Sequence, residues 1–200
     1  LHPDAIVTQI QCEVCAVSED DVRTAVADWL DARPKVISTN ASNMSGVFAD
    51  IRRVGRMLGV SDAADELNAA LSERLDVLRL AAASVDERPS VACIEWVTPM
   101  MTSGNWMPEL IELAGGQSLL ARTGEHSPWI EWDEIRAANP QVLIVSPCGF
   151  DLGRATAEVD EMRALPGWDE LDAVRAGRVY AVDGHQYFHR PGPRLVDSAE

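Results

Sequence analysis

Two pairs of side chains have a spacing that could support chemistry. Cys12 and Cys15 form a C-x-x-C in "TQIQCEVCAV", and His185 and His189 stand four residues apart in "DGHQYFHRPGPR". A C-x-x-C can be a redox pair, half of a metal site or a disulfide. Two histidines four apart could hold a metal or haem iron from one face of a helix. The spacing alone leaves all of these interpretations open.

The surroundings of both pairs weaken the reactive interpretations. Gly184, Pro191 and Pro193 interrupt the histidine segment, so we expect solvated or hydrogen-bonded imidazoles there, not a helical ligand pair. The C-x-x-C lies in a loop after a strand, and a further turn precedes the helix start predicted by Ser18 and Asp21. We expect cleft-lining thiols or small packing residues there first, a disulfide second and a metal ligand third. No metal site is predicted for the chain.

Composition and missing motifs narrow the function classes. The chain has 17 Lys and Arg against 32 Asp and Glu, a net charge of −15, which disfavours binding to nucleic acid. It contains no G-x-x-x-x-G-K-[ST], no G-x-S-x-G and no H-E-x-x-H. Cys93 lies inside the apolar run "SVACIEW" and is expected to be a buried small side chain. The chain is therefore not predicted to be an enzyme.

Strands and helices alternate along the chain. Short apolar runs predict strands in "PDAIVTQ", "KVIST", "SVACIEW", "QVLIVSP" and "RVYAVDG". Apolar residues at helical spacing, with a stop at Gly59, predict a helix in "MSGVFADIRRVGRMLG". Further helices are expected in "WMPELIELAG", in "EWDEIRAAN" and near residues 155–165. Such alternation is typical of parallel sheets covered by helices on both faces.

One long helix is expected to divide the chain. Residues from Ser61 to about Val85 lack glycine and proline and carry leucines on one face. We therefore predict an α/β fold of two Rossmann-like lobes with parallel sheets. Residues 1–60 would form a partial N-terminal lobe, 61–87 the linking helix and 88–200 the C-terminal lobe. Loops at the carboxyl ends of the strands would face a cleft between the lobes.

The side chains that follow the predicted strands are mostly amides, rings, thioethers and hydroxyls. These groups suit the binding of a large, uncharged, amide-bearing ligand by stacking and neutral hydrogen bonds. Trp129 is expected to be covered by the ligand, and Trp132 is expected to pack between helix and sheet. Trp29 and Trp168 are expected to pack in the core or on a lobe surface. The predicted ligand-binding residues are Gln9, Gln11, Met101, Thr102, Trp106, Trp129, Phe150, Gln186 and Tyr187.

Five phrases in a fixed order resemble one known family. They are "PDAIVTQIQCEVCAVS", "TSGNWMPELIELAGG", "PWIEWDEIRAANPQVLIVSPCGFDL", "PGWDELDAVRAGRVYAVDG" and "YFHRPGPRLVDS". Together they resemble the cobalamin-binding branch of the helix-linked (class III) periplasmic substrate-binding proteins of ABC transporters. The resemblance implies a ligand clamped between two lobes and delivered to a membrane permease. Cobalamin or a related corrinoid would be the transported ligand, with no cofactor.

The resemblance also assigns roles to individual residues. It implies that Trp129 stacks near the corrin, that Met101 replaces an aromatic contact and that Gln9 stands at a ring-stacking position. Gln186 and Tyr187 match polar and aromatic positions of the final loop. Glu13 and Asp133 match the acidic residues, one on each lobe, that arginines of the permease hold.

The family usually begins with another strand-helix unit, so the resemblance implies a truncated N-terminal lobe and a chain that ends inside its last helix. It further implies a monomeric protein in the periplasm or outside the cell, free or lipid-anchored. Within the same fold, an iron-siderophore or haem carrier is the alternative, with Arg190 and Arg194 facing an anionic chelate. A thiol oxidoreductase using Cys12 and Cys15 is the alternative from another class.

Overall fold

The computed structural model describes residues 3–10, 19–29 and 34–200. The chain forms two compact units, one up to Leu71 and one from Ser72 onwards. Both units are α/β, and a single helix, α3 (Ser61–Ala83), contains the boundary between them. The helix predicted from Ser61 to about Val85 therefore starts at the same residue as α3 and ends two residues later.

The first unit contains a two-stranded parallel sheet. Strand β1 (Ala5–Gln9) pairs with β2 (Lys35–Thr39), and Gln9 lies opposite Thr39. Helix α1 (Glu19–Trp29) lies between the strands in sequence, and α2 (Met44–Leu58) follows β2. The strands match those predicted from the apolar runs, α1 matches the helix predicted to start after Ser18, and α2 matches the helix predicted to stop at Gly59.

Local capping sets the ends of α2. The Asn43 side chain accepts a hydrogen bond from the Gly46 backbone N–H at 2.8 Å, which satisfies one of the free donors of the first turn. Gly59 has φ of 74° in the left-handed region, and its N–H donates to the Arg56 carbonyl at 3.3 Å. A glycine suits this position because it has no Cβ to clash there.

The second unit is built on a five-stranded mixed sheet. Its strand order is β4-β3-β6-β7, with β5 also paired to β3. The strands β3, β5, β6 and β7 are parallel, and β4 runs antiparallel to β3. Their bounds are β3 Ser90–Trp96, β4 Met101–Thr102, β5 Gln117–Ser118, β6 Val142–Val145 and β7 Val179–Ala181.

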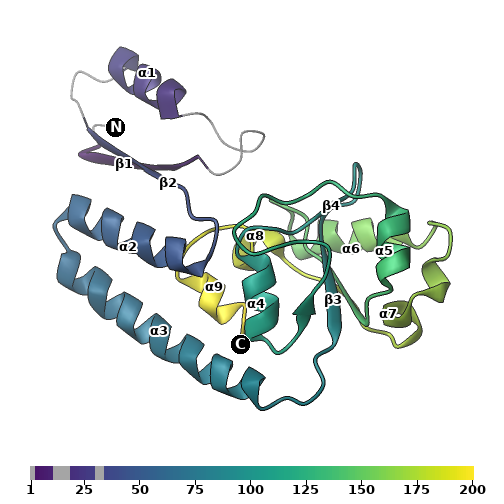
Figure 1. The fold of residues 1–200 in the computed structure, drawn as a ribbon. Coiled ribbons are helices and arrows are strands. Elements are labelled where there is room, and N and C mark those ends of the chain that lie inside the picture. Colours follow the sequence, from purple (N-terminus) through teal and green to yellow (C-terminus); the bar gives the residue numbers. More distant parts are fainter. Residues whose placement is uncertain (1–2, 11–18, 30–33) are drawn as a thin grey trace. The chain divides into compact units, whose positions relative to one another are not determined.

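Helices cover both faces of this sheet (Figure 1). Helices α5 (Trp132–Ala138), α6 (Leu152–Met162) and α7 (Asp172–Arg175) lie on one side. Helices α4 (Met107–Leu113), α8 (Gly184–Tyr187) and α9 (Arg194–Asp197) lie on the other. A 3-10 turn, η1 (Trp168–Glu170), precedes α7. No helix among the described residues is long and apolar enough to cross a membrane.

The central strands β3 and β6 are covered on both faces. Ile94 of β3 and Leu143 of β6 are fully buried in one core with Ile135 of α5 and Met162 of α6. The intervening residues, such as Ile144, face the side on which α4 lies. Because both faces are covered, these strands read as continuous apolar runs in the sequence.

Strands β4 and β5, helices α7 and α8 and the 3-10 turn η1 were not predicted. Met101 pairs with Trp96 to form the antiparallel strand β4, in a segment where no strand was predicted. Strand β5 was also missed, since a two-residue strand shows no periodicity. The segment after β7 was expected to lack helix, yet Gly184–Tyr187 form α8, whose first turn Asp183 caps by accepting from the Gln186 N–H at 2.8 Å.

Candidate functional site

The carboxyl ends of β3, β6 and β7 meet at one edge of the second sheet, because these strands are parallel. Backbone hydrogen bonds join the segments that follow them. The Cys148 N–H donates to the Glu95 carbonyl at 3.1 Å, and the His185 N–H donates to the Phe150 carbonyl at 3.2 Å. Side chains from three separate parts of the sequence are thus brought to a common edge, which we call the carboxyl edge.

Trp129 lies beside the edge strand β4. It forms an isolated backbone bridge with Met101, and the Thr102 N–H donates to the Pro128 carbonyl at 3.1 Å. Its indole remains 59% exposed, which is unusual for a side chain of this size. The structure therefore presents Trp129 on a surface, as a ligand-stacking residue requires.

The final loop presents a second set of predicted residues. Gln186 and Tyr187 are exposed at the end of α8, and the guanidinium of Arg194 lies 5.6 Å from the centre of the Tyr187 ring. The Gln186 side-chain amide donates to Asp183 at 3.1 Å. Phe150 is half-buried. These groups combine rings with a neutral amide.

Phe150 is held by two neighbours. Its ring meets Trp96 edge-on, with ring centres 5.4 Å apart. The guanidinium of Arg154, a residue of α6, lies 5.1 Å from the centre of the Phe150 ring. An aromatic ring fixed by such contacts loses little conformational entropy when a ligand covers its remaining surface.

Three other predicted ligand residues are buried. Met101, Thr102 and Trp106 are 6%, 1% and 4% exposed. Thr102 Oγ1 donates to the Leu120 carbonyl at 3.1 Å, and Trp106 Nε1 donates to the Phe188 carbonyl at 2.7 Å. These bonds hold the loops beside the carboxyl edge in place. Direct ligand contact by these three residues stays a prediction.

Only some of the predicted residues of the first unit lie in the described part of the chain. Gln9 is half-buried at the end of β1. Gln11, Glu13 and the Cys12 and Cys15 pair lie outside the described residues. Their roles, and the predicted cleft between the lobes, stay predictions.

Asp133, the predicted docking acid, lies in the first turn of α5. Its side chain is 83% exposed, and a carboxylate oxygen lies 2.9 Å from a guanidinium nitrogen of Arg136 on the same helix. Exposed ion pairs of this kind contribute little stability. The carboxylate can therefore exchange Arg136 for an arginine of another protein at small cost.

Several packing predictions are confirmed. Trp132 stacks on Trp168 with ring centres 6.1 Å apart, and its Nε1 donates to the Pro166 carbonyl at 2.8 Å. Cys93 is only 2% exposed, and burial raises the pKa of its thiol to about 12. Cys93 is therefore protonated and unreactive at neutral pH. The side chain of Trp29 lies outside the described part of the chain.

A polar cluster also lies at the carboxyl edge. The sequence did not predict that these side chains would come together. Ser127 Oγ donates to Glu95 Oε2 at 2.5 Å. His189 Nδ1 lies 3.9 Å from Glu95 Oε1, and His189 Nε2 lies 2.6 Å from the Ser146 carbonyl oxygen. Burial lowers the pKa of His189, while Glu95 acts in the opposite direction. The imidazole is therefore mostly neutral at neutral pH.

The sequence held signals for this cluster. Glu95 is an acidic residue near the end of the apolar run "SVACIEW", where a charge is costly unless it is paired. His189 was considered together with His185, but the structure separates them. His185 is exposed, whereas the His189 side chain is only 8% exposed. Neither signal identifies Ser127, whose partner lies 32 positions away.

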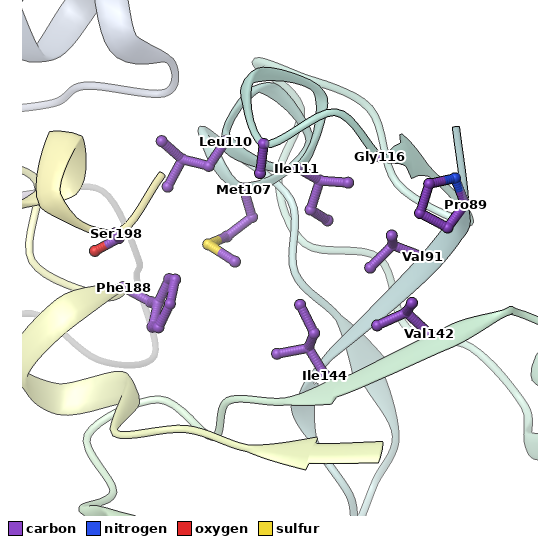
Figure 2. Close-up of a pocket in the computed structure, with 11 residues that line it drawn as sticks. Pro89, Val91, Met107, Leu110, Ile111, Gly116, Val142, Ile144, Phe188 and Ser198 are labelled. Carbon is purple, nitrogen blue, oxygen red and sulfur yellow. The ribbon is translucent and has the colours of Figure 1, made fainter. Parts of the chain in front are cut away.

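The face of the sheet opposite the main core contains an apolar cavity of about 170 Å³ (Figure 2). Met107, Leu110 and Ile111 of α4 point into it from one side, and Val142 and Ile144 of β6 line the other. Pockets for drug-sized ligands are usually about 300–1,000 Å³. The cavity is too small and too apolar for a large amide-bearing ligand, and it does not contain the predicted site.

Comparisons with known proteins agree with this architecture. The family profile described as "Periplasmic binding protein" matches residues 1–185. An ABC transporter substrate-binding lipoprotein of Bacillus subtilis, YvrC, is 25% identical over 184 residues, which cover 88% of this chain and 55% of that protein. A vitamin B12-binding protein of Vibrio cholerae is 28% identical over 100 residues, covering 50% of this chain and 33% of that protein.

The fold recurs in a solved structure. The periplasmic haem-binding protein RhuT of Roseiflexus sp. RS-1 in its apo form superposes with a TM-score of 0.76 at 20% identity, covering 98% of this chain and 73% of RhuT. At this identity the likeness shows the shared fold alone. The match to residues 1–185 shows that the chain belongs to the periplasmic binding protein family. The chain spans about half the length of the YvrC relative, 55%.

Proposed function

We propose that this chain is the substrate-binding component of an ABC importer, and that it carries cobalamin or a related corrinoid in the periplasm or outside the cell. Membership of the family supports the transport role, and a vitamin B12-binding protein is among the relatives. The observation that carries the choice of ligand is the set of exposed neutral groups beside the carboxyl edge. Trp129, Gln186 and Tyr187 form this set.

The chemistry of these groups fits a corrinoid. A corrin ring is large and flat, and its rim carries amides. An exposed indole offers a face for stacking, and a carboxamide can both donate to and accept from a ligand amide. Binding of this kind needs no catalytic group, so the chain acts by holding and releasing its cargo.

Calorimetric titration of the chain with cyanocobalamin tests the proposal. We expect saturable binding of one cyanocobalamin per chain. Haemin and a ferric hydroxamate siderophore serve as competing ligands in parallel titrations. Failure of the chain to bind cyanocobalamin, together with saturable binding of either competitor, would replace the corrinoid with an iron-bearing cargo.

Such an iron-bearing cargo is the second candidate, and cations in the final loop favour it. Arg190 donates from Nε to the His185 carbonyl at 3.1 Å, and Arg194 lies over Tyr187. Two exposed arginines near an exposed histidine could hold the carboxylates of haem or an anionic ferric chelate. Replacing Arg190 and Arg194 by Gln would weaken haemin binding strongly if this candidate is correct. Cyanocobalamin binding would change little.

The proposed permease contact can be tested at Asp133. In a reconstituted transporter, Asp133→Asn is expected to lower transport while cyanocobalamin affinity stays unchanged, because a permease arginine would lose its carboxylate partner. Asp160 is a matched control, since it is also exposed and one of its carboxylate oxygens lies 3.1 Å from Nε of Arg163, three residues later in the chain. Equal transport by both variants would remove Asp133 from the docking surface.

A further inference from the structure

Three side chains with metal-binding atoms converge at the carboxyl edge. They are Glu95 near the end of β3, Cys148 in the loop after β6 and His189 after α8. One ligand atom from each lies within 4.8 Å of the others, and this is the one such group among the described residues. Each side chain is partly buried, so the group is shielded without being sealed.

The imidazole of His189 is oriented with a lone pair towards Glu95. Its Nε2 lies 2.6 Å from the Ser146 carbonyl oxygen, which can only accept a hydrogen bond. Nε2 therefore carries the hydrogen in the neutral ring, and Nδ1 carries the lone pair. A histidine whose second nitrogen donates to a backbone carbonyl is the usual arrangement of a metal ligand.

The carboxylate of Glu95 is oriented as well. Its Oε2 accepts from Ser127 Oγ at 2.5 Å, and Ser127 Oγ in turn accepts from the Gly104 N–H at 2.9 Å. This leaves Oε1 facing His189 Nδ1 at 3.9 Å. In the neutral form of His189, two acceptors face each other and neither donates. A cation between them would satisfy both.

We propose that Glu95, Cys148 and His189 form a binding site for one divalent transition-metal ion of the Zn²⁺ type, with Ser127 and Ser146 as positioning residues. The mixture of carboxylate, thiolate and imidazole suits Zn²⁺ and its relatives better than Ca²⁺ or Mg²⁺, which prefer oxygen ligands alone. Three protein ligands leave a fourth position of a tetrahedral ion open to water or another small ligand.

The observed spacing requires only a small adjustment. Zn²⁺ lies about 2.0–2.1 Å from nitrogen or oxygen ligands and about 2.3 Å from sulfur, so neighbouring ligand atoms around one ion are roughly 3.3–3.6 Å apart. A group spread over 4.8 Å must therefore contract by about 1 Å. Because Glu95 and His189 are already 3.9 Å apart, rotation of the Cys148 side chain can supply most of this movement without a change of fold.

Metal binding by the full chain, freed of metal with a chelator and studied without cobalamin, tests the site. Zn²⁺ affinity is measured by competition with a chromogenic chelator, and Co²⁺ reports thiolate ligation through its sulfur-to-cobalt charge-transfer band. We expect one ion per chain and a clear band. Cys148→Ser should abolish the band, and His189→Gln and Glu95→Gln should each weaken Zn²⁺ binding at least about 100-fold. Ser127→Ala should weaken it roughly 10-fold with the band intact.

Matched controls separate this site from other ligands. His185→Gln changes the exposed histidine of the same segment and should leave Zn²⁺ affinity unchanged. Cys12→Ser/Cys15→Ser should keep the cobalt band. Loss of the band in that double variant but not in Cys148→Ser, or no Zn²⁺ binding by the unaltered chain, would overturn the proposal. Because the readouts use no cobalamin, the result is independent of the importer hypothesis.

Discussion

At the scale of single residues, exposure separates the predicted ligand contacts into two groups. Trp129 and Tyr187 keep 59% and 44% of their surface accessible, whereas Met101 keeps 6%. A ligand can gain stacking energy only from a ring face that it can reach. The exposed residues should therefore dominate the affinity, and the buried ones should act on the shape of the loops.

Trp129→Ala is expected to weaken cyanocobalamin binding by about 2 kcal/mol, roughly 30-fold in Kd, because buried tryptophans at the centre of interfaces contribute energies of this size. Calorimetry measures the change. Tyr180→Ala is the control, since Tyr180 is 50% exposed but lies within β7, apart from the predicted ligand residues. Similar affinities for Trp129→Ala and the unaltered chain would exclude Trp129 from the binding surface.

The residue-level site was predicted only in part. The ligand-binding positions that follow strands could be predicted from the sequence, because each apolar run is followed by polar or aromatic residues. The pairing of Glu95 with Ser127 could not be read in this way, because it depends on antiparallel β4 bringing residues 101–102 beside 128–129. A two-residue strand leaves no pattern that would have indicated this contact.

At the scale of elements, Gly104 shows how close the loop after β4 comes to its neighbour. A Cβ at this position would lie 2.6 Å from the Glu125 carbonyl oxygen and 2.7 Å from the Ser127 nitrogen, both of them backbone atoms. Neither atom can move without shifting the segment that carries Ser127. The close approach therefore supports the position of Glu95 as well as the loop.

Gly104→Ala is expected to lower the free energy of unfolding by about 1–3 kcal/mol, the usual effect of overpacking a buried site. Urea titration followed by far-UV circular dichroism measures it. Gly153→Ala is the matched control, because a Cβ there meets only an Asp151 side-chain oxygen at 3.4 Å, and alanine suits a helix better. A Gly104→Ala variant as stable as Gly153→Ala would contradict the tight packing.

Arg74 connects α3 to the last turn of the chain. Its guanidinium donates to Glu200 at 2.6 and 2.8 Å and to Asp197 at 2.7 Å. These bonds hold the pKa of Glu200 below its usual value of about 4.5. The charged form is favoured in the folded state, so the stabilising contribution is present above pH 4.5 and is lost as the pH falls through the lower, folded-state pKa.

Arg74→Gln should therefore lower the melting temperature slightly at pH 7, and the difference from the unaltered chain should shrink in acid. Melting curves of both proteins at pH 7 and at pH 3 measure the difference in melting temperature at each pH. Arg79→Gln is the control, because Arg79 pairs with Asp76 within α3 and does not reach α9. If the difference in melting temperature between Arg74→Gln and the unaltered chain stayed constant with pH, the ion pair with Glu200 would contribute nothing to stability.

The elements themselves were largely predictable. Helices α2 and α3 follow from apolar spacing over many residues, and the parallel strands follow from uninterrupted apolar runs. Helix α8 was missed because glycine and prolines surround it and because it is only four residues long. The Asp183 cap stabilises its first turn, and a single capping residue leaves no hydrophobic periodicity in the sequence.

At the scale of the whole molecule, the boundary between the two compact units falls inside α3. The units meet at Leu71 and Ser72, in the middle of a helix that runs from Ser61 to Ala83. Sequence patterns predicted this helix but treated it as a separate segment between two lobes. In the structure its first half belongs to the first unit and its second half to the second, so unfolding of one unit should disturb the other through the shared backbone.

Ser72→Pro tests this coupling, because proline inside a helix removes a hydrogen bond and clashes with the preceding turn, at a cost of about 3 kcal/mol or more. Most tryptophans lie beyond Ser72, so fluorescence reports mainly the second unit, whereas circular dichroism reports both. In the unaltered chain the two urea curves should coincide, and in Ser72→Pro they should separate. Ser61→Pro is the control, since proline is tolerated at the first helical position. Coincident curves in Ser72→Pro would mean that continuity of α3 does not link the two units.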